Sequence, residues 1–166
     1  ESDLDMKLVY DVAHNIAKVE KHKVDGEERN LVVHRKGATR AFPSNRAEIP
    51  SKYRDLGQPV LVPGSMGTSS WILLGKSNSM DLSFGSTAHG AGRTMSRSKA
   101  RRNFTEDNVK KSLNDKGIFI KALTRDGVVE ETPEAYKDVD SVVNVSHNLG
   151  IATKVAKLVP IGVIKG

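Results

Sequence analysis

The stretch between Ser86 and Arg97 places a single histidine, His89, among small residues, with arginines directly after them. Gly90 and Gly92 have no Cβ, so the backbone can approach a ligand closely and can turn successive N–H groups toward an anion. A neutral imidazole can attack phosphorus and form a covalent intermediate. The stretch therefore predicts a phosphate-binding loop with a nucleophilic histidine at its mouth. The alternative is a glycine-rich turn that carries an incidental histidine.

The composition indicates one basic domain. The 166 residues carry a formal charge of +6, which suits a polyanionic partner such as RNA, although a merely basic surface is the alternative. Cysteine is absent, which excludes disulfides and thiolate metal sites within this sequence. No apolar run approaches the ~20 residues of a membrane span. The first residues lack a basic region followed by an apolar one, so we expect an intracellular, cytoplasmic protein.

The hydrophobic pattern predicts an α+β fold of mixed strands, short helices and long irregular loops. Apolar residues recur every four positions from Leu4 to Ile16, which predicts a helix over 3–21. Further helices are expected over 96–102, 106–114 and 140–149, with a helical turn after Pro133. Strands are expected over 30–34, 59–62, 71–75, 82–85, 118–120 and 155–164, the last broken near Pro160, with a turn at 126–127. The polar segment 36–52 is expected to be a functional loop.

Several motifs occur in a fixed order. They are His-Asn at 14–15, His-Arg-Lys-Gly-Ala-Thr-Arg-Ala-Phe-Pro at 34–43, Pro-Gly-Ser-Met-Gly-Thr at 63–68, the histidine stretch, and Val-Pro-Ile-Gly-Val-Ile-Lys-Gly at 159–166. This series resembles the RtcB family of RNA-splicing ligases from about Asp11 to Gly166. The family proteins are much longer. The resemblance therefore implies that residues 1–166 are the C-terminal portion of an RtcB-like catalytic domain whose upstream part is absent, and the start on glutamate agrees with this.

The resemblance also implies roles for individual residues. His89 would be the nucleophile that becomes guanylylated by GTP, and His14 would bind Mn²⁺. By itself, a lone histidine on a helix is more often a surface or core residue, and the remaining family ligands (an aspartate, a cysteine and two histidines) would lie upstream. The residues that would contact the nucleotide are Asn15, Pro63, Gly64, Ser65, Met66, Ser70, Gly90, Ala91, Gly92, Tyr136 and Lys165.

These nucleotide contacts have simpler alternatives. Pro63 and Gly64 fit an ordinary turn between two strands, Tyr136 fits a packing aromatic, and Lys165 fits a solvated lysine. A basic set is expected to hold RNA ends or the leaving phosphate, because arginine pairs with phosphate in a bidentate manner and lysine acts as a point charge. Its members are Arg35, Lys36, Arg40, Arg93 and Arg97. On a helix, the last two would share one face.

The function implied by the resemblance is that of a GTP- and Mn²⁺-dependent RNA ligase. It would join RNA ending in a 3′-phosphate or 2′,3′-cyclic phosphate to RNA with a 5′-hydroxyl, through a histidine–GMP intermediate. Transfer RNA exon halves are the expected substrate, with RNA repair as a second use, and the upstream portion of the same protein is the expected partner. Two alternatives are a non-catalytic RNA-binding module and a structural fragment that needs a partner chain. The 166 residues alone are expected to be inactive.

Overall fold

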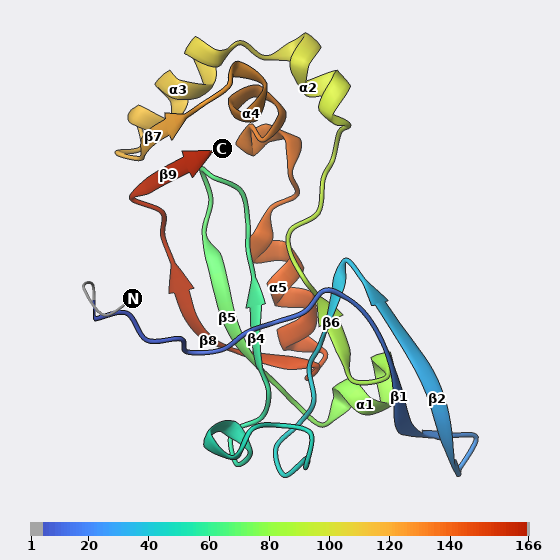
Figure 1. The fold of residues 1–166 in the computed structure, drawn as a ribbon. Helices are drawn as coiled ribbons and strands as arrows, with labels where there is room; N and C mark the ends of the chain where they lie inside the picture. Colours follow the sequence, from blue (N-terminus) through green and yellow to red (C-terminus); the bar gives the residue numbers. More distant parts are fainter. Residues whose placement is uncertain (1–4, 166) are drawn as a thin grey trace.

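The computed structural model describes residues 5–165 and has the predicted α+β architecture (Figure 1). The strands are β1 (Asn15–Val24), β2 (Glu27–Lys36), β3 (Ala38–Arg40), β4 (Pro59–Val62), β5 (Ser70–Gly75), β6 (Ser86–Ala88), β7 (Phe119–Ala122), β8 (Ala152–Leu158) and β9 (Gly162–Lys165). The α-helices are α1 (Asn78–Ser83), α2 (Arg97–Asn103), α3 (Glu106–Asn114), α4 (Arg125–Glu130) and α5 (Val139–Asn148). Short 3₁₀ turns cover Ser51–Tyr53 and Pro133–Ala135.

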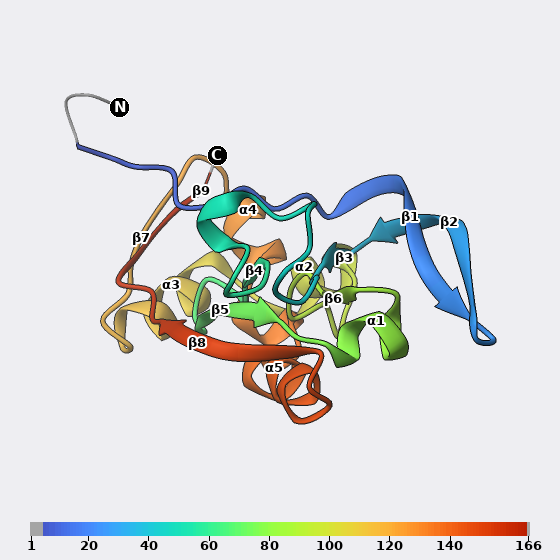
Figure 2. The same ribbon diagram turned by 90° about the horizontal axis from the view of Figure 1, so that it is seen from below.

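The first hydrophobic core lies between a three-stranded antiparallel sheet, of order β4-β5-β8, and helix α5. Val60, Val62 and Leu73 of the sheet are buried against Val139 and Val143. The two helix residues are four positions apart and therefore share a face. Figure 2 shows α5 lying along one side of this sheet. The packing fixes the ends of β4 and β5, from which the loop 63–69 extends.

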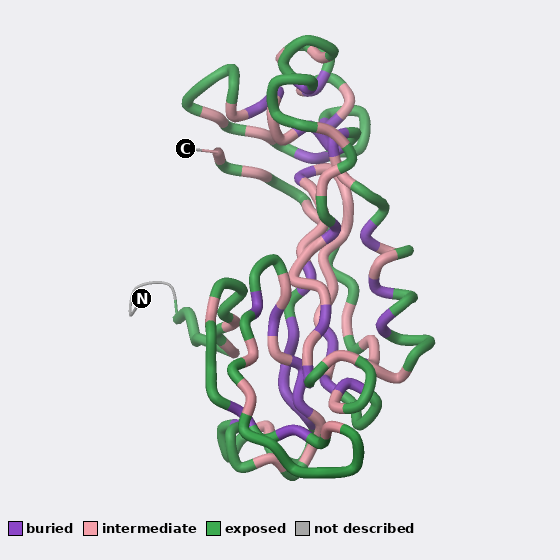
Figure 3. Tube along the Cα trace, turned by 90° about the vertical axis from the view of Figure 1, so that its right-hand side faces the viewer, coloured by how far each residue is buried: buried purple, intermediate pink, exposed green. Residues whose placement is uncertain are grey.

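The second core lies in the part drawn at the top of Figure 1, where α2, α3 and α4 gather around the parallel pair β7 and β9. Val109, Leu113, Ile118 and Val128 are buried there together with Met66 from the β4–β5 loop. Figure 3 shows buried residues concentrated along the central strands and again in this upper part. Because Met66 anchors the loop 63–69 in the second core, the loop connects the two packed regions.

Residues Asn15–Val24 form a strand, so the helix predicted over 3–21 is wrong for the described part of that range. β1 pairs with β2 across Asp25 and Gly26, whose φ values of 52° and 88° suit a tight hairpin turn. The buried positions of β1 include Glu20 and His22. Because these two buried residues are polar, the sequence of β1 lacks the alternation of apolar and polar residues that indicates a strand. The hairpin projects from the body of the molecule in Figures 1 and 2.

Two further local predictions are wrong. Residues 82–85 are not a strand, because helix α1 runs to Ser83 and ends at Phe84, whose φ is 49°. The turn predicted at 126–127 lies inside α4, whose first turn is capped by the Thr124 hydroxyl accepting from the Gly127 N–H. The break near Pro160 is confirmed, since β8 ends at Leu158 and β9 starts at Gly162. Among residues 5–165, no helix is long and apolar enough to cross a membrane.

Candidate functional site

The strand pairing brings His14 and His89 together. His14 directly precedes β1, and His89 directly follows β6, which pairs with β3. Gly37 lies between β2 and β3. Its N–H donates to the His14 carbonyl at 3.0 Å, and its own carbonyl accepts from the His89 N–H at 3.4 Å. The φ of Gly37 is +65°, a conformation that glycine adopts without strain. The predicted metal ligand and the predicted nucleophile therefore lie side by side.

The two imidazole rings are stacked, with centroids 3.9 Å apart and planes 13° apart. His14 is exposed, whereas His89 is half-buried and its Nδ1 atom is buried without a hydrogen-bond partner. Burial lowers the pKa of His89 below its usual range, and the charge of His14 lowers it further. His89 is therefore neutral at neutral pH and keeps an unprotonated ring nitrogen, the form that attacks an electrophile.

The loop after His89 adjoins the β4–β5 loop. The Ala91 N–H donates to the Pro63 carbonyl at 3.0 Å, and a Cβ at Gly90 would lie 3.2 Å from the same oxygen. A Cβ at Gly64 would lie only 2.2 Å from the Ser69 carbonyl oxygen, so that position requires glycine. The predicted nucleotide-contacting residues of the two loops are thus neighbours in space.

A cavity of about 540 Å³ opens beside these loops, within the size range of small-molecule sites. Seven of the predicted nucleotide-contacting residues line it: Pro63, Gly64, Ser65, Met66, Ser70, Tyr136 and Lys165. They come from the β4–β5 loop and the first residue of β5, the segment after α4, and β9. Three separate segments of the chain therefore converge on one cavity.

One wall of the cavity is a polar cluster. The Tyr136 hydroxyl donates to the carboxylate of Glu131, and Arg93 Nη1 donates to the Tyr136 oxygen at 3.0 Å. The Arg93 guanidinium also lies over the Tyr136 ring, 4.9 Å from its centroid. Burial and the hydrogen bond to Glu131 raise the pKa of Tyr136, so the hydroxyl stays protonated at neutral pH.

The chain matches the family described as tRNA-splicing ligase RtcB over residues 1–166. It belongs to the RtcB family. The curated tRNA-splicing ligase RtcB of Archaeoglobus fulgidus is 57% identical over 166 residues, which are 100% of this chain and 34% of that protein. Its namesake in Methanococcus maripaludis is 54% identical over 164 residues, covering 99% of this chain and 34% of the relative. The one in Pyrococcus furiosus is 55% identical over 166 residues, which are 100% of this chain and 17% of that protein. The chain thus spans about a third of these relatives' length, or less.

The basic residues expected to contact RNA in this RtcB family member have unequal environments. Lys36 is exposed at the end of β2, next to Gly37, and Arg97 is 64% exposed at the start of α2. Arg40 is half-buried, with its Nε donating to Gln58 at 2.9 Å. Arg93 precedes α2 and forms a β-bridge with Tyr136, so the prediction that Arg93 and Arg97 share a helical face is wrong.

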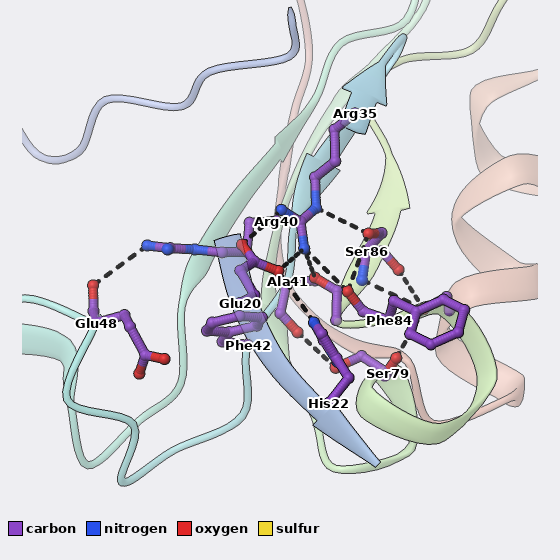
Figure 4. A network of polar contacts seen from close by, with 12 residues as sticks. Glu20, His22, Arg35, Arg40, Ala41, Phe42, Glu48, Ser79, Phe84 and Ser86 are labelled. Carbon is purple, nitrogen blue, oxygen red and sulfur yellow. Dashed lines mark hydrogen bonds and ion pairs between the residues drawn. The ribbon is translucent and has the colours of Figure 1, made fainter. Parts of the chain in front are cut away.

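Arg35 differs most from expectation. It is 1% exposed and forms a bidentate pair with Glu20, both bonds 2.8 Å long (Figure 4). Two further N–H groups donate to the Phe84 carbonyl at 2.9 Å and the Ser86 hydroxyl at 2.8 Å. Four of the five N–H groups of this buried guanidinium are used in this way. In this structure Arg35 attaches the hairpin to the start of β6, and its contact with RNA stays a prediction.

The remaining predicted residues lie at the edges of the site. Asn15 is the exposed first residue of β1, directly beside His14. Gly92 has a φ of +74° and open space where a Cβ would stand. Sequence reasoning missed Glu131, which lines the cavity, because a glutamate at a helix end matches no motif. No local signal marks it, since the pair Glu130–Glu131 stands among both acidic and basic residues.

Proposed function

We propose that this chain carries the nucleophile and the nucleotide pocket of an RNA ligase that acts in tRNA splicing. The observation that carries the proposal is the half-buried His89, stacked on His14 at one end of a glycine loop that contacts the cavity wall at Pro63. The relatives' shared name, tRNA-splicing ligase RtcB, supports an RNA-joining reaction. In the proposed reaction, His89 attacks the α-phosphorus of GTP, a P–N bond forms, and pyrophosphate leaves.

The second half of the reaction uses the histidine-bound GMP. An oxygen of the RNA 3′-phosphate attacks the phosphorus, the P–N bond breaks, and GMP is transferred to the RNA end. The 5′-hydroxyl of the second RNA then attacks the activated 3′-phosphate, loses its proton and expels GMP. A 2′,3′-cyclic phosphate is first opened to the 3′-phosphate by water. Lys36 and Arg97, the exposed basic residues of the expected set, are proposed to hold the RNA.

The residues of the cavity fit a guanine nucleotide. Tyr136 offers a ring for stacking, and Lys165 offers a charged donor to the O6 and N7 acceptors of guanine. Gly92 has open space where a Cβ would stand, so a phosphate can approach the backbone there. The buried, unpartnered Nδ1 of His89 is a polar atom whose partner is not supplied by residues 5–165.

Mn²⁺ fits this chain only in part. His14 has an exposed imidazole, which suits a divalent transition metal. Within the described residues no group of three or more potential ligands lies together, so His14 needs partners from elsewhere. We propose that they come from the part of the protein that corresponds to the rest of the relatives' length. Bound Mn²⁺ would supply positive charge to phosphate oxygens.

A joining assay tests the proposed function. The natural polypeptide that carries this chain is incubated with an RNA ending in a 2′,3′-cyclic phosphate, an RNA with a 5′-hydroxyl, GTP and Mn²⁺. The account predicts a joined product in the wild-type protein and none in His89→Asn. Salt-sensitive RNA binding without joining would favour the non-catalytic RNA-binding module instead.

A further inference from the structure

We infer that Glu131 is a positioning residue of the nucleotide pocket, which fixes the Tyr136 ring and places a negative charge in the cavity that Lys165 also lines, and thereby sets the preference for a guanine base. Glu131 follows the last residue of α4 and lines the cavity. The inference rests on the proposed function, because it assigns the pocket a nucleotide. It adds a residue that neither a motif nor the resemblance indicates.

The carboxylate of Glu131 is the meeting point of several donors. One oxygen, Oε2, accepts from the Tyr136 hydroxyl. The other, Oε1, lies 3.4 Å from both Arg93 Nη1 and Arg97 Nε. The side chain is only 22% exposed, so solvent screens these contacts less than it would on an open surface. Glu131 thus connects the pocket wall to two arginines of the basic set.

The contacts of Tyr136 allow one ring orientation. Its hydroxyl is held by Glu131, and Arg93 covers one ring face, 4.9 Å from the centroid. Arg93 is itself fixed, since its Nη2 donates to the Glu130 carbonyl at 2.6 Å and its Nε to the Met95 carbonyl at 3.0 Å. The ring also lines the cavity. A ring held at its hydroxyl and at one face is pre-organised for a base to stack on the other face.

Glu131 and Lys165 also line the same cavity. Burial raises the pKa of Glu131, but the hydrogen bond from Tyr136 and the positive charges of Lys165, Arg93 and Arg97 outweigh it. The pKa therefore lies below 4.5, and the carboxylate is ionised at neutral pH. The opposite charges of Glu131 and Lys165 attract each other within the cavity that both line, where Lys165 offers a donor. Guanine offers acceptors at O6 and N7, whereas adenine presents an amino donor at the equivalent edge.

The test compares nucleotide binding by variants of the natural polypeptide, with GTP and ATP as the probes in calorimetric titration. Glu131→Gln keeps the shape and an acceptor for Tyr136 but removes the charge. We expect it to weaken GTP binding about tenfold and to leave ATP binding nearly unchanged, so that the GTP/ATP preference falls. The matched control is Glu130→Gln. Glu130 pairs with Arg97 and Arg101 but does not line the cavity, so both affinities should stay at the wild-type value.

Tyr136→Phe removes only the hydroxyl and tests the same link if Glu131→Gln does not fold. It should weaken GTP binding about threefold, and its effect should be less than additive with Glu131→Gln because one variant removes and the other weakens the same Tyr136–Glu131 hydrogen bond. A lower melting temperature in Glu131→Gln with an unchanged GTP/ATP preference would assign Glu131 a structural role and overturn the inference. An equal loss in Glu130→Gln would also overturn it. Absence of GTP binding by the wild-type protein would instead overturn the proposed function, and this inference with it.

Discussion

The imidazole rings of His14 and His89 are stacked with centroids 3.9 Å apart, although His14 precedes β1 and His89 follows β6. One glycine joins them, since Gly37 donates to the backbone of His14 and accepts from the backbone of His89. The open end of the β1–β2 hairpin and the end of β6 therefore meet at a single residue. The relation between the proposed metal ligand and the proposed nucleophile depends on the conformation of that residue.

Gly37→Ala should slow RNA joining more than it destabilises the fold. A Cβ at this position meets nothing within 4 Å, so the cost is that of a left-handed backbone, about 1 kcal/mol. Gly26→Ala is the matched control, because Gly26 has a φ of +88° with open space around it at the far end of the same hairpin. Both variants should lose similar stability in chemical denaturation, but only Gly37→Ala should lower the joining rate, about tenfold. Equal joining rates would show that Gly37 does not position the histidines.

Glu20→Gln should destabilise the fold by about 3 kcal/mol, because it leaves the Arg35 charge buried without its partner. The side chains of Glu20 and Arg35 are 4% and 1% exposed. Glu27→Gln is the control in the same hairpin, since the Glu27–Arg29 pair is exposed to solvent and should contribute little. Urea denaturation measures both. A loss in Glu20→Gln no larger than in Glu27→Gln would contradict the role given to the buried pair.

The same pair predicts a pH dependence of stability. Burial raises the pKa of Glu20, but the hydrogen bonds from Arg35 and His22 outweigh it and hold the pKa below its ordinary value of 4.5. The contribution of Glu20 is therefore fully present above pH 4.5 and is lost as the pH falls through the lower pKa of the folded state. The difference in unfolding free energy between wild type and Glu20→Gln should be constant above pH 5 and shrink below 4.5. A difference that grows on acidification would have the wrong sign.

Arg97→Ala and Arg93→Ala should separate RNA contact from structure. Arg97 is 64% exposed with contacts of 3.4 Å only, so its loss should lower the joining rate while the melting temperature changes little. The donors of Arg93 bind Met95, Glu130, Glu131 and Tyr136, so its loss should lower both the joining rate and the melting temperature. Melting curves and joining rates from the same preparations give the comparison. A large melting drop in Arg97→Ala with normal joining would return Arg97 to a structural role.

Mn²⁺ should bind the isolated 166 residues weakly, because His14 alone cannot hold a catalytic ion. Adding the portion that corresponds to the rest of the relatives' length, in the same polypeptide or as a separate chain, should tighten Mn²⁺ binding and restore joining. Calorimetric titration of Mn²⁺ into each preparation measures the effect. Tight stoichiometric binding by the 166 residues alone would require a self-contained metal site among them.

The sequence predicted those elements that follow from local rules. Helix α3 has the predicted bounds, 106–114, because Thr105 caps its first turn and Val109 and Leu113 share its buried face. The strand at 59–62 is an apolar run between turn signals and has the predicted limits. The helix prediction for residues 15–24 was wrong because the buried side chains of this strand, Glu20 and His22, are polar. Glu20 pairs with His22 and with Arg35 of the neighbouring strand. No local pattern contains that tertiary partner.

The sequence also indicated some residues of the candidate site and not others. The convergence of Pro63, Tyr136 and Lys165 on one cavity agrees with the set inferred from ordered motifs, although their roles remain proposals. The environment of Arg35 could not be inferred, because a basic residue inside a motif looks the same whether it contacts a phosphate or a buried carboxylate. Glu131 was missed for the converse reason, since its importance comes from neighbours distant in the sequence.

Covalent labelling identifies the residue that attacks GTP. The natural polypeptide is incubated with α-labelled GTP and Mn²⁺, digested, and the labelled peptide is identified by mass spectrometry, with His89→Asn and Gly26→Ala treated in parallel. The account predicts an acid-labile label on His89, as expected of a P–N bond, in the wild type and in Gly26→Ala, and none in His89→Asn. A label that persists in His89→Asn, or that maps to another residue of the wild type, would contradict the assignment of His89 as the nucleophile.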